Sequence, residues 1–243
     1  MRLVSPTIVR LGVKSIFGRW RGVLLFVLPL VLVGLAVLAR ALVGQSEEGS
    51  QHTLYGLGLV VVVPLVALLA TSGLLAPEID DGSISYLLAK PVPRSTIVLS
   101  KLVVAVACVL AFASVPMLLA GLVLRTDDPS VAVGFALGSV LGGTAYCALF
   151  ALLSVMTRHA VVIGLVYLLV WEGLLGGLLD GVRWLSITRW SAEVADRVAG
   201  LSLVDGLPLT YALAAALLTI VGGTWLTGRR LRVKQRDVAA VPV

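Results

Sequence analysis

The stretch EIDDGSISYLLAKPVPRSTIVLSK, residues Glu78–Lys101, separates two long apolar runs and holds three acidic residues, three basic residues and two prolines. The 243-residue chain around it is 59% hydrophobic and only 13% charged, whereas soluble domains are usually about 25% charged. Apolar runs of about 20 residues cross a bilayer as helices, because lipid offers no partner for open backbone groups. The composition therefore excludes a soluble globule and a disordered chain, and predicts one membrane domain over 1–243.

We predict an all-α protein with six transmembrane helices. The spans are expected near residues 22–43, 54–76, 98–124, 131–156, 160–179 and 207–227. Polar segments join them, and the longest are 77–97 and 180–206. Pro29, Pro64 and Pro116 fall inside spans and are expected to kink them.

The distribution of Lys and Arg predicts the orientation, because short cytoplasmic segments of membrane proteins are enriched in both. If the N-terminus is cytoplasmic, 14 of the 19 Lys and Arg residues fall in cytoplasmic segments. We therefore expect both termini inside, with a basic tail over 228–243, and the 180–206 segment outside. This topology explains the net charge of +6 better than nucleic-acid binding does.

The first 21 residues are amphipathic on a helical wheel, with apolar residues on one side and bases beside them. Such a helix lies in the membrane interface with its bases towards anionic headgroups. A positively charged flank without fixed structure is the alternative. A cleaved signal peptide is less well supported, because the apolar run before Ala39–Ala41 is longer than a usual signal core.

Within the opening stretch, the sequence SISYLLAK places Ile84, Leu87 and Leu88 at helical spacing. Pro91 and Pro93 end this helix, since proline cannot continue the hydrogen-bond ladder. We expect a short helix on the cytoplasmic membrane surface, held between stiff turns. A helix of this kind fits a groove on another protein.

This connector resembles the E-x-x-x-G-[ST]-I-x-Y-L-L-x-x-P-V-x-R-x-x-I-x-x-x-K pattern of type-2 ABC-exporter permeases. The matching residues are Glu78, Gly82, Ser83, Ile84, Tyr86, Leu87, Leu88, Pro91, Val92, Arg94, Ile97 and Lys101. The order of elements is similar to the branch whose permease is a separate six-span chain. In that family the connector carries a coupling helix that docks onto an ATP-binding subunit.

The resemblance implies a membrane-spanning permease subunit of an ATP-driven exporter in the plasma or inner membrane. Its implied partners are two copies of an ATP-binding-cassette ATPase and a second, identical permease, with no nucleic acid. The implied coupling residues are Glu78, Gly82, Ser83, Tyr86, Leu87, Leu88, Lys90 and Arg94. Short outer helices before span six are also implied, which close the outer mouth.

The sequence contains no G-x-x-x-x-G-K-[ST] phosphate loop. ATP and Mg are therefore expected on the partner subunit, and the chain itself is expected to be neither an enzyme nor a cofactor or metal carrier. H-E-x-x-H and G-x-S-x-G patterns are also absent, which disfavours an intramembrane enzyme. A membrane scaffold with the same fold and a proton-coupled carrier remain as alternatives.

Glu172 is the one carboxylate well inside a predicted span. A buried acid is costly in a membrane unless it is protonated or paired. Glu172 is therefore either a substrate-path or outer-gate residue, or a protonated carboxyl bonded to a neighbouring helix. Trp171 beside it is either part of the same path or an interfacial anchor.

Small residues predict where helices approach closely. Gly134, Gly138 and Gly142 recur every four residues along span four and give it one smooth face. That face packs either within the chain or against a second subunit. Cys108 and Cys147 fall in apolar runs and are expected to be small buried hydrophobes.

The predicted topology can be tested by single-cysteine labelling with a membrane-impermeant maleimide. In a background without Cys108 and Cys147, we expect a cysteine placed within Ser46–Ser50 to react only from outside the cell. The reason is the enrichment of Lys and Arg in the segments assigned to the cytoplasm. Reaction only from the cytoplasmic side would overturn the topology.

Overall fold

The computed structural model describes residues 20–44, 46–80, 94–157, 159–175, 181, 184–204 and 206–239. These parts of the chain are helices and short connections, without any strand. The predicted all-α class is therefore confirmed. The interfacial helix expected over 1–21 and the core of the expected coupling segment, residues 81–93, lie outside the described residues.

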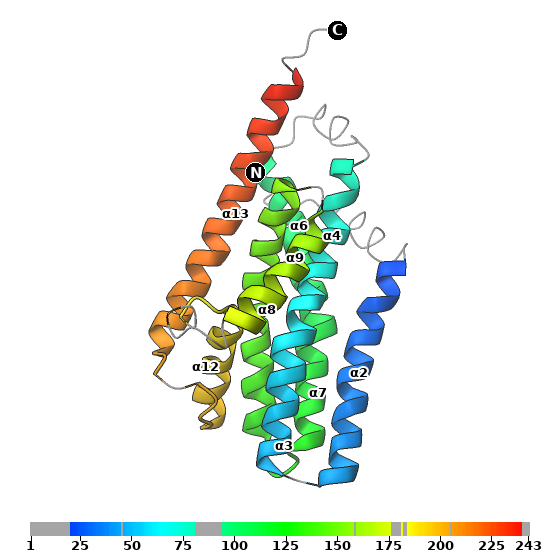
Figure 1. Cartoon of the computed structure of the whole chain (residues 1–243), viewed down its shortest axis with the longest axis vertical. Coiled ribbons are helices and arrows are strands. Elements are labelled where there is room, and N and C mark those ends of the chain that lie inside the picture. The colour runs from blue at the N-terminus through cyan, green and yellow to red at the C-terminus, as the bar shows by residue number, and fades with distance from the viewer. Residues whose placement is uncertain are drawn as a thin grey trace.

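Six helical segments run roughly along the long axis of the molecule (Figure 1). The first segment is α2 (Trp20–Val43). The second consists of α3 (Glu47–His52), η1 (Thr53–Val62) and α4 (Val63–Asp80). The third consists of α6 (Arg94–Val109), η2 (Leu110–Ser114) and α7 (Val115–Leu124). The other three are α8 (Pro129–Met156); α9 (Ala160–Tyr167) and η3 (Leu168–Leu175); and α13 (Leu209–Ala239). The η segments are π-helical. A shorter helix, α12 (Ile187–Ala199), precedes α13.

Most of these segments have the length and composition of membrane spans. Among the described residues, five helices are long and apolar enough to cross a membrane, and Ala160–Leu174 is a shorter apolar helix. Large apolar side chains such as Leu30 on α2 and Leu218 on α13 are exposed. Exposed apolar side chains on such long helices suit contact with lipid. The chain is a multi-pass membrane protein.

Three helices extend beyond the predicted spans. α4 continues to Asp80, α6 begins at Arg94, and α13 continues to Ala239, through most of the region expected as a basic tail. An apolar run ends where a helix leaves lipid, but backbone hydrogen bonds continue into the polar residues that follow. Arg, Lys and Gln are good helix formers, so the sequence gives little sign of where these helices stop.

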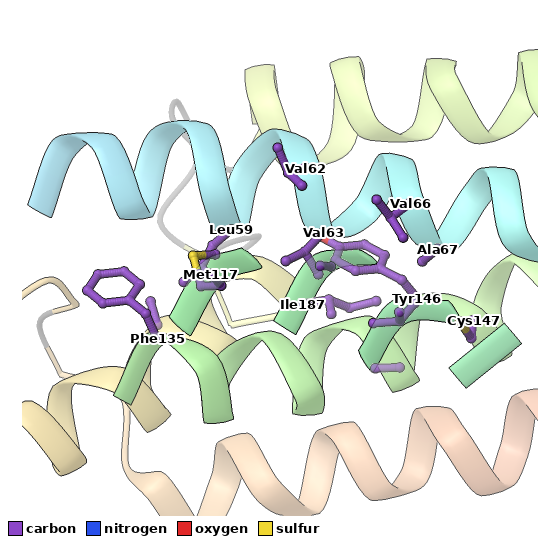
Figure 2. Packing of buried hydrophobic residues seen from close by; sticks show 14 of the residues in the cluster. Leu59, Val62, Val63, Val66, Ala67, Met117, Phe135, Tyr146, Cys147 and Ile187 are labelled. Carbon is purple, nitrogen blue, oxygen red and sulfur yellow. The ribbon is translucent and has the colours of Figure 1, made fainter. Parts of the chain in front are cut away.

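α8 is the central helix. It contacts α4, α6, α7, α9, α12 and α13, and its Phe135, Tyr146 and Phe150 are fully buried. Figure 2 shows Val63 and other residues of the second segment facing Tyr146 of α8 and Ile187 of α12. α8 therefore packs directly against the second, third, fifth and sixth segments, whereas α2 packs mainly on α7.

Two of the predicted proline irregularities are π-helical turns. Pro64 and Pro116 lie directly after η1 and η2. Proline has no N–H, so the carbonyl four residues before it loses its helical partner. The ladder shifts at this point to bonds five residues apart, such as Val63 N–H to the Gly58 carbonyl. Pro29, by contrast, lies inside the α-helix α2.

The glycine face of α8 packs against α12. A Cβ atom at Gly134 would lie 2.9 Å from the Ala195 carbonyl oxygen, and one at Gly138 would collide with the Ser191 carbonyl oxygen. At Gly142 a Cβ would collide with the Ser191 hydroxyl. Only glycine permits this approach of the two backbones. The predicted glycine face is thus covered within the chain.

α12 runs antiparallel to α8 and enters the membrane from one side. Ile187 lies near Gly142, and Ala199 lies near Gly134. Gly142 is about 20 Å along α8 from Pro129 at 1.5 Å rise per residue, and a hydrocarbon core is about 30 Å thick. The first turn of α12 therefore lies deep in the membrane, and its last turn lies towards the end of the bundle that holds α3 (Figure 1).

Replacing Gly138 with alanine should destabilise the protein by about 1–3 kcal/mol, because the added methyl group overpacks the α8–α12 contact. We expect a lower melting temperature in detergent. The matched control is Gly222→Ala on α13, where an added Cβ meets no atom within 4 Å. That control should be neutral or slightly stabilising, since alanine is the better helix former. Equal melting of Gly138→Ala and wild type would contradict the close contact.

Candidate functional site

The predicted coupling residues lie mostly outside the described residues. Gly82, Ser83, Tyr86, Leu87, Leu88 and Lys90 all belong to the segment 81–93. The backbone of Glu78 lies in the last turn of α4, and that of Arg94 begins α6. α4 and α6 pack against each other. Both ends of the expected coupling segment are therefore attached to a pair of neighbouring helices.

Glu172, the predicted intramembrane acid, lies in η3 and caps the N-terminus of α12. The Ser186 hydroxyl donates to Glu172 Oε2 at 2.5 Å, and the Ile187 backbone N–H donates to Oε1 at 3.0 Å. Ser186 also accepts a bond from the Arg189 N–H at 3.2 Å. The first N–H groups of a helix have no partner within it, and the helix dipole favours negative charge there. Glu172 and Ser186 thus accept hydrogen bonds from backbone N–H groups for which lipid offers no acceptor.

Two interpretations of Glu172 were predicted: a residue of the substrate path or outer gate, or a protonated carboxyl bonded to a neighbouring helix. The carboxyl is bonded to a neighbouring helix, and both of its oxygens act as acceptors in these bonds. The second partner, the Ile187 N–H, is held at the buried start of α12. A part in the substrate path or outer gate stays a prediction.

A row of aromatic rings joins α8 to the segment that carries Glu172. Tyr146 stacks on Phe150 with ring centroids 5.7 Å apart, and Phe150 meets Tyr167 edge-on at 6.4 Å. Tyr167 stacks on Trp171 at 6.3 Å. Each such pair contributes about 0.5–1.5 kcal/mol beyond area burial. Trp171 therefore ends an internal aromatic row, which helps to fix the position of Glu172.

Side chains from other spans also contact the first turn of α12. The Tyr146 hydroxyl and the Thr188 hydroxyl are 2.8 Å apart, with both residues buried. Tyr146 interacts electrostatically with Glu172 as well. We call Glu172, Ser186, Tyr146 and Thr188 together the α12 cap. Tyr55 of η1 interacts with Arg189 next to it, so three spans meet at this point.

The other end of α12 is fixed by a second carboxylate. Gly200, at a positive φ of 65°, ends the helix in a left-handed turn. The Asp196 carboxylate, only 8% exposed as a residue, accepts bonds at 2.9 Å from the N–H groups of Leu203 and Val204. A carboxylate therefore bonds backbone N–H groups at the start of α12 and just after its end.

An indole also ties α12 to its flanking segments. Trp190 Nε1 donates to the Trp184 carbonyl at 2.8 Å, and the Tyr211 hydroxyl of α13 donates to the same carbonyl at 3.1 Å. The Trp184 and Tyr211 rings also meet edge-on at 5.1 Å. These contacts join α12 to the start of the sixth segment.

A polar cluster joins the first three segments at the end of the bundle that holds α3. Arg125 pairs with Glu47 at 3.1 Å and with Asp127 at 3.2 Å, and Arg40 donates to the Leu124 carbonyl at 3.1 Å. Hydrogen bonds from its own backbone and from Arg125 hold the pKa of Asp127 below its usual value. The Glu47 side chain is 74% exposed, and exposed ion pairs stabilise little. This cluster fixes connections and is a weaker candidate site than the α12 cap.

Three of the four residues of the α12 cap were not predicted from the sequence. Ser186 had a usable signal, because serine before an apolar run that begins a helix is a common N-cap. Tyr146 and Thr188 had none, since their partners are remote in sequence. Within the described ranges, no group of three His, Cys, Asp or Glu residues could hold a metal ion. The arrangement holds the first turn of α12 in place.

The chain matches a known protein family but no individual curated protein. No curated protein matches the sequence significantly. The family described as "ABC-2 family transporter protein" matches residues 13–226, which is most of the chain, includes the connector 77–97 and ends within the last described span. The chain therefore belongs to the ABC-2 family of transporter proteins.

Proposed function

We propose that this chain is the membrane-spanning permease subunit of an ATP-driven exporter and couples through residues 77–97 to a separate ATP-binding subunit. The main observation in support of this proposal is the family match over residues 13–226, together with the connector pattern inside that range. In this proposal two permease chains assemble with two ATPase subunits in the cell membrane, with both termini cytoplasmic. ATP and Mg bind to the ATPase.

The packing of the helices supports a route for the motion. A partner that displaces residues 81–93 moves the end of α4 and the start of α6, which pack together. Both helices contact α8, and α8 contacts α12 along its glycine face. The motion therefore reaches α12 through one central helix. Close-packed helices transmit such displacements because their interiors resist compression.

In the same proposal α12 is the outer gate and Glu172 is its latch. α12 lies in the outer half of the membrane under the proposed orientation, and its first turn is held by the α12 cap. Breaking two hydrogen bonds at Glu172 frees the N-terminus of α12 without disturbing a covalent bond. Trp171 supports the latch through the aromatic row.

The proposal is tested by reconstitution of the permease in nanodiscs with an ATP-binding-cassette ATPase, sought first among the products of the neighbouring genes. We expect a stable complex and ATP hydrolysis that rises when the permease is present. A complex without stimulated hydrolysis supports the scaffold alternative. Transport driven by a proton gradient without ATP supports a secondary carrier and overturns the proposal.

Leu87→Asp tests the docking of the connector. It places a charge in a contact that excludes water, and should cost about 2–4 kcal/mol of association, which weakens binding by tens- to hundreds-fold. The measurements are co-purification with the ATPase and stimulated ATP hydrolysis. Leu87→Met keeps the apolar volume and serves as the control. Wild-type binding by Leu87→Asp would remove the docking assignment, and a collapsed melting curve of the permease alone would make the segment structural.

Glu172→Gln tests the latch. Glutamine offers one acceptor oxygen in place of two, so one buried donor at the start of α12 loses its partner at a cost of about 1–3 kcal/mol. We expect α12 to leave its site more often, by roughly ten-fold for each 1.4 kcal/mol. The reporter is Ala192→Cys, a fully buried position on α12, labelled with an impermeant maleimide in the cysteine-free background.

The control for this experiment is Ala212→Cys, which is equally buried but lies on α13. Glu172→Gln should accelerate labelling at position 192 and leave labelling at position 212 unchanged. Equal acceleration at both positions indicates general loosening of the fold. Unchanged labelling at position 192 rules out Glu172 as the latch.

A further inference from the structure

A buried ammonium group joins α4 to α6. Lys101 is only 5% exposed, and its Nζ donates to the Leu74 carbonyl of α4 at 2.8 Å. Lys101 is the eighth residue of α6, and Leu74 lies six residues before the end of α4. These two helices are the ones that residues 81–93 connect. The bond therefore spans the base of that connector.

The surroundings make this bond unusual. The flanking residues Val98, Val104 and Ala105 of α6 are buried and apolar. An ammonium group inside a membrane protein costs several kcal/mol unless it is paired or bonded. An apolar side chain of similar volume would fill the same space, and such replacements are often neutral for stability. Packing alone therefore does not account for a lysine here.

The backbone carbonyls near the end of α4 favour a cation such as the Lys101 ammonium as their partner. Pro77 lies in α4 and has no N–H, so it cannot donate to the carbonyl four residues before it as other helical residues do. Carbonyl oxygens towards the end of a helix also carry the negative end of its dipole. Lys101 thus meets α4 where the helix ladder is interrupted and its carbonyls attract a cation. The link between Lys101 and Leu74 is a hydrogen bond and therefore depends on direction, whereas an apolar contact does not.

We propose that Lys101 is a positioning residue that clamps α4 to α6, so that the two helices move as one unit when the chain between them is displaced. The proposal rests on the proposed function, because it assumes that a partner ATPase acts on that chain. Without the clamp, displacement is absorbed by sliding between α4 and α6. With it, the displacement passes to α8, which both helices contact.

The first arm of the test measures coupling. Lys101→Met keeps the length and apolar body of the side chain but removes the donor, Lys101→Arg keeps a donor, and Lys234→Met controls for loss of one positive charge. We expect Lys101→Met to bind the ATPase and to melt like wild type, but to lose about five-fold or more of the permease-stimulated ATP hydrolysis, the scale of a typical coupling energy. Lys101→Arg and Lys234→Met should retain it.

The second arm measures the clamp without any ATPase. Nitroxide labels at Leu69→Cys on α4 and at the exposed Val103→Cys on α6 report the distance between the helices by pulsed electron resonance. Lys101→Met should broaden this distance distribution, and Lys101→Arg should not. An unchanged distribution overturns the clamp.

The two arms separate the possible failures. Broadened distances with wild-type stimulated hydrolysis overturn the positioning role. Loss of melting temperature in parallel with loss of hydrolysis overturns it too, because Lys101 is then structural. If the wild-type permease does not stimulate hydrolysis at all, the proposed function and the coupling role fail together, and the distance arm still decides whether α4 and α6 are clamped.

Discussion

The close approach of α12 to α8 is the contact on which the end of the bundle that holds α12 depends. Gly134 and Gly138 bring the α8 surface against backbone carbonyls of α12, with no side chain between them. Dispersion forces act over such short separations, and in a membrane they replace the hydrophobic effect as the main attraction between helices. Since α8 also contacts most other spans, this contact sets the position of α12 for the whole bundle.

A helix that begins deep in a membrane must satisfy its first N–H groups without water. Here Glu172 and Ser186 do so, and Asp196 bonds the N–H groups that follow the other end of α12. The intramembrane acid is therefore explained by the helix end it bonds. Two hydrogen bonds join this acid to the start of α12, while many atoms form the glycine contact.

The opposite end of the bundle follows the same rule with the opposite charge. Pro77 interrupts the hydrogen-bond ladder of α4, and the Lys101 ammonium binds a carbonyl there. A carboxylate thus bonds the start of one helix and an ammonium bonds a carbonyl near the end of another, as the helix dipole favours. Glu172 and Lys101 therefore each mark a place where a helix cannot complete its own hydrogen bonds.

The all-α class, the approximate spans, the glycine face and the unusual acid could be predicted from the sequence, because apolar length, residue spacing and a charge in an apolar run are local properties. The sequence also indicated the family resemblance through the connector pattern around Gly82 and Leu87. That the glycine face receives α12, that Glu172 bonds Ser186 and that Lys101 reaches Leu74 became visible in the folded structure alone. Glu172 and Ser186 are 14 residues apart and Lys101 and Leu74 are 27 apart, and nothing local in a sequence specifies which remote helix end a side chain will meet.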